Sequence, residues 1–465
     1  MRVSTPTPRK ATSAGRSRPR GIADGSPVVP PRLPVPAVTS SPAAGSRAAG
    51  DAIDDANVEV AKAITPPGSW GGALPVFGGS VRVAVRVRPL SPGEEGIIEV
   101  AGDTVLIRKE AATGGNEFLS SQQGRTEERT FERVFAPSVT QQEVYEWSTR
   151  PLVAAAVGQG HNATVFVYGA TGAGKTHTMF GEPNEIEQGL IYRAVREVFT
   201  TLQQRSAADQ TLEAKVSFLE LYNEKVLDLL QEGGAVCSLL EDERRGIVKI
   251  ANLREVLVHS ADEAFKQLHA GLQIRKVEST GANQRSSRSH AVFVLQLERV
   301  LQEQDGSAGM RRPYSKICLI DLAGSERASH TQNVGSALRD GAKINQSLLA
   351  LANCINALSS VQQQSERPSL EGGREGAKTP QRKPPYRDSK LTLLLKSSLV
   401  GTGLVSMVAN VHPGRQHFED SNNTLEYAKR TSAVRVQALV RREARDGASS
   451  VPARRRRVAP SPPPW

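Results

Sequence analysis

One stretch constrains this chain more than any other, the GxxxxGK[ST] phosphate-loop pattern formed by Gly169, Ala170, Thr171, Gly172, Ala173, Gly174, Lys175 and Thr176. In such a loop, glycines let backbone amides turn inward around a β-phosphate, and the following helix points its positive end at the anion. Lys175 would neutralise β- and γ-phosphate oxygens, and the Thr176 hydroxyl would ligate Mg²⁺. A Gly-rich turn before a helix explains the glycines but not the Lys-Thr pair, so we favour a nucleotide site.

Two later segments have the composition expected of γ-phosphate sensors, NQRSSRSH at 283–290 and DLAGSER at 321–327. Asp321 follows an apolar run, so its carboxylate should lie at the end of a strand, near Mg²⁺ and its waters. Gly324 can bring its amide against the γ-phosphate without a side-chain clash. We expect Glu326 and Arg288 to form an ion pair when both loops close, which would fix the attacking water. The alternative for each is a solvated surface charge.

The predicted nucleotide is ATP, since no [NT]KxD arrangement that could read guanine is present. Phosphoryl transfer needs positioning and charge stabilisation more than covalent chemistry, so amides, Lys175 and Mg²⁺ would suffice.

The positive charge is concentrated at the two ends of the chain. Residues 1–50 carry eight Lys or Arg against one Asp, and residues 429–465 carry ten against two acids. The total net charge of +11 therefore leaves 51–428 at −4. We predict no specific nucleic-acid partner, although basic tails bind any polyanion at low salt. The alternative interpretation, an ATPase that acts on nucleic acid, is supported only by these basic tails.

The cysteines and the hydropathy exclude several other classes. Cys237, Cys318 and Cys354 lie far apart without a CxxC pair, which argues against a disulfide framework or zinc knuckle and suits a reducing compartment. No apolar run approaches the ~20 residues of a membrane helix, so no membrane partner is expected. The first 22 residues faintly resemble a transit peptide, but prolines favour a disordered basic arm.

The alternation of predicted strands and helices along the chain predicts an α/β fold with a mixed, mostly parallel central sheet and helices on both faces. A disordered Pro/Ala/Ser-rich extension covers 1–79, the folded domain covers 80–431, and a basic Pro/Arg-rich tail covers 441–465. No heptad follows Val436, so the chain should lack a coiled-coil stalk and be monomeric. Predicted strands are 81–89, 130–135, 164–168, 215–221, 247–258, 290–301 and 315–321, and predicted helices are 141–157, 261–276, 334–358, 389–399 and 422–436.

Five strings resemble the kinesin motor domain, a P-loop NTPase, over about residues 81–437. These strings are specific to kinesins. Myosins also have a phosphate loop, but they lack the Ser-His pair of SSRSHAVF and the string PYRDSKLT. The similarity is greatest to the kinesin-8 class. The strings are YGATGAGKTHTM (168–179), SSRSHAVF (286–293), LIDLAGSERAS (319–329), INQSLLALANCINAL (344–358) and PYRDSKLT (385–392).

This resemblance implies roles for individual residues. Arg86, Arg88, Pro89 and His177 would flank the adenine. Asn283, Ser286 and Ser287 would form switch I, and Asp321, Gly324 and Glu326 switch II. Mg²⁺ would be held by Thr176, Ser287 and Asp321. The implied catalytic set is Lys175, Ser286, Ser287, Arg288, Gly324 and Glu326.

The resemblance also implies a track-binding face. The helix 334–358 would lie on tubulin, and residues 432–440 would be a neck linker whose C-terminal position argues for plus-end direction. Acidic tubulin would attract this face in a salt-sensitive way. Gln346 and Leu393 stand where cations are usual. The long loop 359–384 is either an extra tether or an insertion of little consequence. The residues implied to face the microtubule are Arg327, Lys343, Tyr386, Arg387 and Lys390.

The sequence thus predicts a microtubule-stimulated ATP hydrolase that moves along microtubules, with ATP and Mg²⁺ bound, in the cytoplasm on the microtubule cytoskeleton. The alternative is a microtubule-binding or end-regulating, depolymerising protein with little motility.

Overall fold

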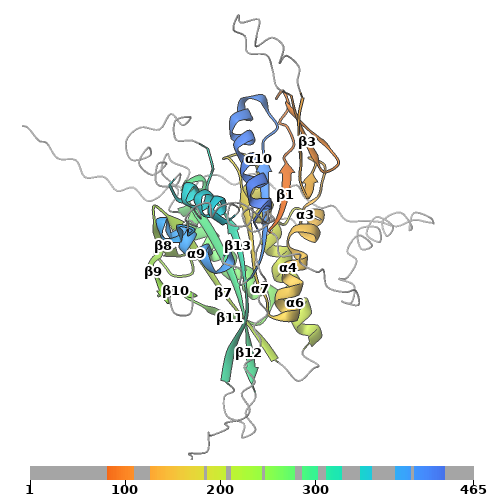
Figure 1. Ribbon diagram of the computed structural model, residues 1–465. Helices are drawn as coiled ribbons and strands as arrows, with labels where there is room; N and C mark the ends of the chain where they lie inside the picture. The colour runs from red at the N-terminus through yellow and green to blue at the C-terminus, as the bar shows by residue number, and fades with distance from the viewer. Residues whose placement is uncertain are drawn as a thin grey trace, which may run out of the picture. The chain divides into compact units, whose positions relative to one another are not determined.

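The computed structural model describes residues 81–434 apart from 109–125, 183–185, 206–210, 243–246, 278–284, 302–309, 327–345, 359–382 and 400–402 (Figure 1). All described residues belong to one of two compact units of the chain, the unit that starts at Pro67. The predicted extension 1–79, the tail 441–465, most of the linker and nearly all of the 359–384 loop lie outside the described residues.

The centre of the domain is an eleven-stranded sheet with the strand order β10-β9-β8-β7-β12-β13-β6-β14-β1-β5, and β11 pairs with β7. Pairing is parallel across β13-β6-β14-β1-β5 and antiparallel in the rest. The sheet is therefore mixed, as predicted, but "mostly parallel" is wrong. The strands are β1 Arg82–Val87, β5 Arg133–Phe135, β6 Asn162–Tyr168, β7 Thr211–Tyr222, β8 Lys225–Asp228, β9 Ala235–Asp242, β10 Ile247–Ala251, β11 Val256–Val258, β12 His290–Leu301, β13 Met310–Asp321 and β14 Gly403–Val411.

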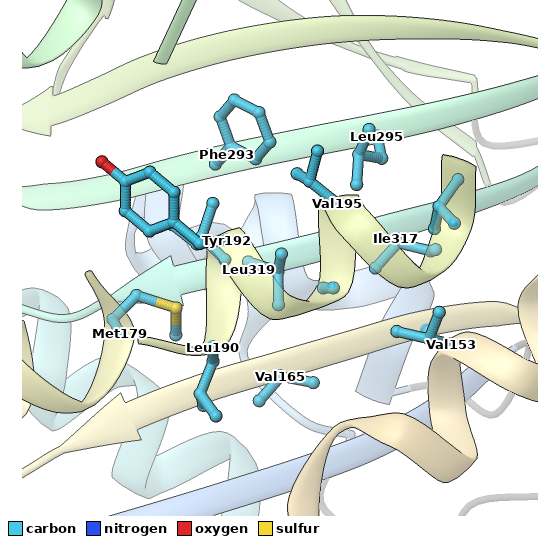
Figure 2. Packing of buried hydrophobic residues seen from close by; sticks show 14 of the residues in the cluster. Val153, Val165, Met179, Leu190, Tyr192, Val195, Phe293, Leu295, Ile317 and Leu319 are labelled. Atoms are coloured by element: carbon cyan, nitrogen blue, oxygen red, sulfur yellow. The ribbon is translucent and has the colours of Figure 1, made fainter. Parts of the chain in front are cut away.

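Successive side chains of the central strands enter two different cores. In β6, Val165 and Val167 belong to one buried cluster, whereas Phe166 belongs to the other. This alternation follows from the period of two along a strand, and it means that both faces of the sheet are covered by apolar side chains. Figure 2 shows the first cluster, in which Leu190 packs near Val165 of β6.

Helices cover each face, which confirms that part of the predicted architecture. On the face of Val165 lie α3 Gln141–Ser148, α4 Arg150–Gln159, α6 Leu190–Arg205 and α7 Ala261–Val277. On the opposite face lie α9 Lys390–Leu399, α10 Phe418–Ser432 and a helical segment at residues 346–358. A small separate sheet is formed by β2 Ile98–Ala101, β3 Thr104–Arg108 and β4 Thr126–Thr130.

Several predicted elements are divided. The helix predicted at 141–157 breaks at Thr149, because Pro151 in the first turn of α4 lacks the N–H that a continuous helix would need. The strand predicted at 130–135 becomes β4 and β5. The one at 247–258 becomes β10 and β11, with Asn252 between them at φ 65°. Elements that the pattern did not predict are β2, β3, β8, β9, β14 and α6.

No helix among the described residues is long and apolar enough to cross a membrane.

Candidate active site

The glycine loop lies where the carboxyl ends of two parallel strands meet. It follows β6, and β6 pairs in parallel with β13, so that Val167 stands opposite Asp321 in the register. The short helix α5 Lys175–Met179 begins directly after the loop. Carboxyl ends of parallel strands at a crossover are where open α/β sheets bind ligands. The sheet order therefore brings together two motifs that are about 150 residues apart in the sequence.

The loop conformation depends on Gly169. Its φ is +145°, and a Cβ there would lie 2.2 Å from the carbonyl oxygen of Asn410 in β14. A side chain would thus collide with the backbone of the neighbouring strand. Gly172 also has a positive φ, +80°, but its Cβ position is open.

Substituting Gly169 by Ala is expected to lower the free energy of unfolding by roughly 1–3 kcal/mol, because the neighbouring backbone must move. Chemical denaturation followed by circular dichroism measures the change. Gly172→Ala is the matched control, since it has φ strain without the clash. Equal losses in the two variants would contradict the assigned contact with β14.

The Lys175 ammonium is buried and lies across its own loop. Nζ donates to the Ala170 carbonyl at 2.8 Å. Burial lowers the pKa of Lys175, and the nearby Asp321 and Glu326 carboxylates oppose that shift. The predicted phosphate-binding cation is thus held inside the loop beside two acids.

Asp321 has one carboxylate oxygen in use and one available. Oδ2 accepts a hydrogen bond from Thr176 Oγ1 at 2.9 Å. Oδ1 is buried and has no hydrogen-bond partner among the described residues. Burial raises the pKa of Asp321, while Arg275 and Lys175 lower it. An orphaned buried carboxylate oxygen beside a threonine hydroxyl fits hydrated Mg²⁺, which prefers oxygen ligands and keeps several waters.

A buried charge cluster that the sequence did not predict lies behind Asp321. The Arg275 guanidinium, near the end of α7, is 3.4 Å from Glu220 of β7 and 3.7 Å from Asp321. It also donates to the backbone carbonyl of Ser289 at 3.3 Å. All three charged side chains are at most 6% exposed. Arg275 therefore joins the end of α7 to both segments that flank the nucleotide loop.

Glu326 contacts the glycine loop. Its two carboxylate oxygens accept hydrogen bonds from the backbone N–H and the hydroxyl of Thr171, at 2.8 and 2.6 Å. In this conformation Thr171 is one partner of Glu326. The ion pair with Arg288 stays a prediction for a closed state.

The two sensor segments are already in contact through their backbones. Gly324 N–H donates to the Ser287 carbonyl at 2.9 Å, and Ser325 N–H donates to the Gly169 carbonyl at 3.1 Å. In this conformation a Cβ at Gly324 would lie 2.2 Å from a Glu326 carboxylate oxygen and 2.3 Å from Thr171 Oγ1, so both side chains would have to move to admit it. These hydrogen bonds couple the two sensor segments to each other and to the glycine loop.

His290 connects this region with the helix at 346–358. Its Nδ1 accepts from the Ala323 N–H at 3.0 Å, and its Nε2 lies 2.9 Å from the Ser347 hydroxyl. Burial, Arg275 and Lys175 lower the pKa of His290 to about 3. The ring is therefore neutral, and with Nδ1 accepting, Nε2 carries the proton and donates to Ser347.

Three of the residues implied to flank the adenine, Arg86, Arg88 and His177, already make hydrogen bonds within the protein. The Arg86 guanidinium donates to Gln141 Oε1 at 2.8 Å and to Thr178 Oγ1 at 3.0 Å. Burial lowers the pKa of Arg86 to about 10. Arg88 donates to the Gly172 carbonyl at 2.9 Å, and the His177 carbonyl accepts from Gln141. Pro89 is exposed. Gln141 organises this network, and no motif marked it in the sequence.

The predicted track-binding residues are partly described. Tyr386 and Arg387 lie in the 3-10 turn η3 Tyr386–Asp388, and Lys390 begins α9. The Arg387 side chain pairs with Glu241 at 2.9 Å, and the Lys390 N–H donates to Glu224 at 2.7 Å. Arg327, Lys343, Asn283 and the Ser286 side chain lie outside the described residues.

Comparison with known proteins identifies the domain. A family model described as the kinesin motor domain matches residues 86–434. Kinesin-related protein 10 of Dictyostelium discoideum is 40% identical over 384 residues, covering 77% of this chain and 29% of the relative. Kinesin-like protein KIN-8B of Arabidopsis thaliana is 39% identical, covering 77% and 41%. Kinesin-like protein KIF19 of Mus musculus is 38% identical, covering 76% and 34%. The chain thus spans less than half the length of these relatives.

Solved structures agree with the sequence comparison. A fast kinesin matches with a TM-score of 0.64 and 31% identity, over 82% of this chain and 99% of that structure. A KIF14 dimer with AMP-PNP on a microtubule matches with the same TM-score and identity, over 78% and 96%. The similarity to the kinesin-8 class is confirmed by the KIN-8B and KIF19 matches. The chain therefore belongs to the kinesin family and carries its motor ATPase domain.

Proposed function

We propose that this protein is a microtubule-stimulated ATPase that moves along microtubules toward the plus end. The observation that carries the proposal is the hydrogen bonding of Glu326 to Thr171, because it links the second sensor segment directly to the phosphate loop. The matched fast kinesin and the KIF14–microtubule complex support microtubules as the partner. We place the protein on the microtubule cytoskeleton of the cytoplasm.

The site residues can supply the chemistry of phosphoryl transfer. ATP would seat its β-phosphate in the loop, and the Lys175 ammonium would turn from the Ala170 carbonyl to phosphate oxygens. Mg²⁺, when bound, would neutralise charge that develops on the β- and γ-oxygens. Thr176, Ser287 and the available oxygen of Asp321 would hold it. Glu326 would leave Thr171 and orient the attacking water.

The same contacts offer a route from the nucleotide to the track. The Gly324 amide senses the γ-phosphate, and the neighbouring Ala323 N–H is bonded to His290. His290 in turn donates to Ser347 of the helix at 346–358. Closure of the sensor segments would thus pull on the helix that we expect to face tubulin, and the linker after α10 would respond.

Steady-state ATP turnover of the purified chain with and without polymerised tubulin, combined with a microtubule gliding assay, tests this proposal. We expect turnover to rise with polymer concentration and filaments to glide.

A second function, regulation of filament ends with little motility, is favoured by Gln346, which is exposed at the start of the helical segment where kinesins usually carry a cation. Shortening of filaments without gliding would support that second function.

Replacing Arg387 and Lys390 together by Ala is expected to weaken binding to polymerised tubulin roughly fivefold at low salt, since two cations leave the proposed face. Co-sedimentation at several salt concentrations measures the affinity. Lys429→Ala on α10 removes an exposed cation elsewhere and serves as the control. Equal binding by the double variant and its parent would contradict the assigned face.

A further inference from the structure

A single carboxylate lies between two cations beside the proposed track-binding face. Glu241, near the end of β9, accepts a hydrogen bond from Arg387 Nε at 2.9 Å, and the same carboxylate oxygen forms an ion pair with Arg387 Nη2 at 2.9 Å. The other Glu241 oxygen accepts from the Lys396 ammonium of α9. Arg387 and Lys396 come from two consecutive elements, η3 and α9. One carboxylate, from a strand distant in the sequence, therefore offsets part of the positive charge of both.

The three side chains differ in their exposure to solvent. Glu241 is 12% exposed, Lys396 is 24% exposed and Arg387 is 66% exposed. The acid therefore lies beneath, and the guanidinium is the part of the cluster that an incoming surface would meet first. Lys396 and Arg387 lower the pKa of Glu241, so the carboxylate is ionised at neutral pH. The cluster carries a net charge of +1 instead of +2.

A second carboxylate on the same side of the sheet has a different task. Glu224, in the turn between β7 and β8, accepts from the Ser389 hydroxyl at 2.8 Å and from the Lys390 backbone N–H at 2.7 Å. It thereby satisfies an amide in the first turn of α9, as a cap does. Its partners in the described structure are a hydroxyl and an amide. Removing its charge therefore releases no cationic side chain.

We propose that Glu241 is an internal competitor for the track, which restrains microtubule affinity by occupying Arg387 and Lys396 until an acidic surface replaces it. This inference rests on the proposed function. An ion pair near the surface contributes little to stability, so exchanging one carboxylate partner for another costs little. Binding would then become a replacement of Glu241 by tubulin carboxylates, and the affinity would depend on how strongly Glu241 competes.

The test is Glu241→Gln, which keeps the shape and removes the charge. Co-sedimentation of the full chain with polymerised tubulin and AMP-PNP is expected to show binding roughly threefold to tenfold tighter than the parent at low salt. The gain should shrink as the ionic strength rises, because exposed charges are screened. Adding Arg387→Ala to Glu241→Gln should remove most of the gain, which a double-mutant cycle would measure.

Glu224→Gln is the matched control, since it changes the net charge equally and touches the same segment. Tightening by Glu241→Gln but not by Glu224→Gln supports the inference. Equal tightening by both variants overturns the inference, and so does unchanged binding by Glu241→Gln. Weaker binding by Glu241→Gln also overturns it, because Glu241 would then position Arg387 for binding. If the parent chain fails to bind polymer even at low salt, the proposed function and this inference fall together. If only the Glu241→Gln effect is missing, the proposed function stands.

Discussion

Glu326→Ala is expected to bind ATP about as well as the parent and to lower the rate of ATP hydrolysis roughly 100-fold or more. The side chain lies beside the phosphate loop, on Thr171, and we assign it the task of fixing the attacking water. Lys175, the backbone amides and Thr176 remain in place, so the contacts that bind the triphosphate are kept. A fluorescent ATP analogue measures binding, and single-turnover phosphate release measures hydrolysis.

Thr171→Val separates the two contacts of Glu326. It removes the hydroxyl hydrogen bond but leaves the Thr171 N–H and the carboxylate. We expect a far smaller loss of hydrolysis than in Glu326→Ala. Hydrolysis at the parental rate in Glu326→Ala would refute the assigned role. A loss of equal size in both variants would mean that the Thr171 contact, not the water, is what matters.

Arg275→Met is expected to lower the free energy of unfolding by about 3–5 kcal/mol, because removing one member of a buried charge cluster leaves uncompensated charge behind. Glu220 would lose the Arg275 guanidinium 3.4 Å away while fully buried, and Asp321 would lose one of the cations that lower its pKa. Urea denaturation measures the change.

Two further variants make this prediction specific. Lys276→Met removes the neighbouring, exposed cation and should change stability by less than about 0.5 kcal/mol. Adding Glu220→Leu to Arg275→Met should recover part of the loss, since the acid is then no longer stranded. A loss below about 1 kcal/mol in Arg275→Met would show that the cluster is compensated by other groups.

Local sequence patterns are enough to predict a nucleotide site, because the residues with that chemistry lie in contiguous motifs. The glycine loop, Asp321 and Glu326 each follow a strand whose apolar run is readable. Val165 to Tyr168 is buried on both faces, as such a run requires. The structure adds that the register of β6 and β13 brings the motifs together.

The remaining parts were hidden for physical reasons. Arg275 and Glu220 are 55 residues apart, and a charged residue near a helix end or within a strand usually faces solvent, so nothing local marks a buried pair. Glu241 and Arg387 are 146 residues apart in the sequence, so no local pattern marks their contact. By contrast, the break at Thr149 was readable, because Pro151 forbids one continuous helix.

The neutral ring of His290 has a consequence for how the protein responds to its medium. A link made of two uncharged hydrogen bonds attracts no counter-ions, and with a pKa of about 3 the ring stays neutral throughout the cellular pH range. Transmission of movement from Ala323 to Ser347 should therefore depend on neither the salt concentration nor the pH. Binding to microtubules, which we propose depends on exposed Lys and Arg side chains, should vary with ionic strength. Ionic conditions would then tune how firmly the motor holds without altering how its interior moves.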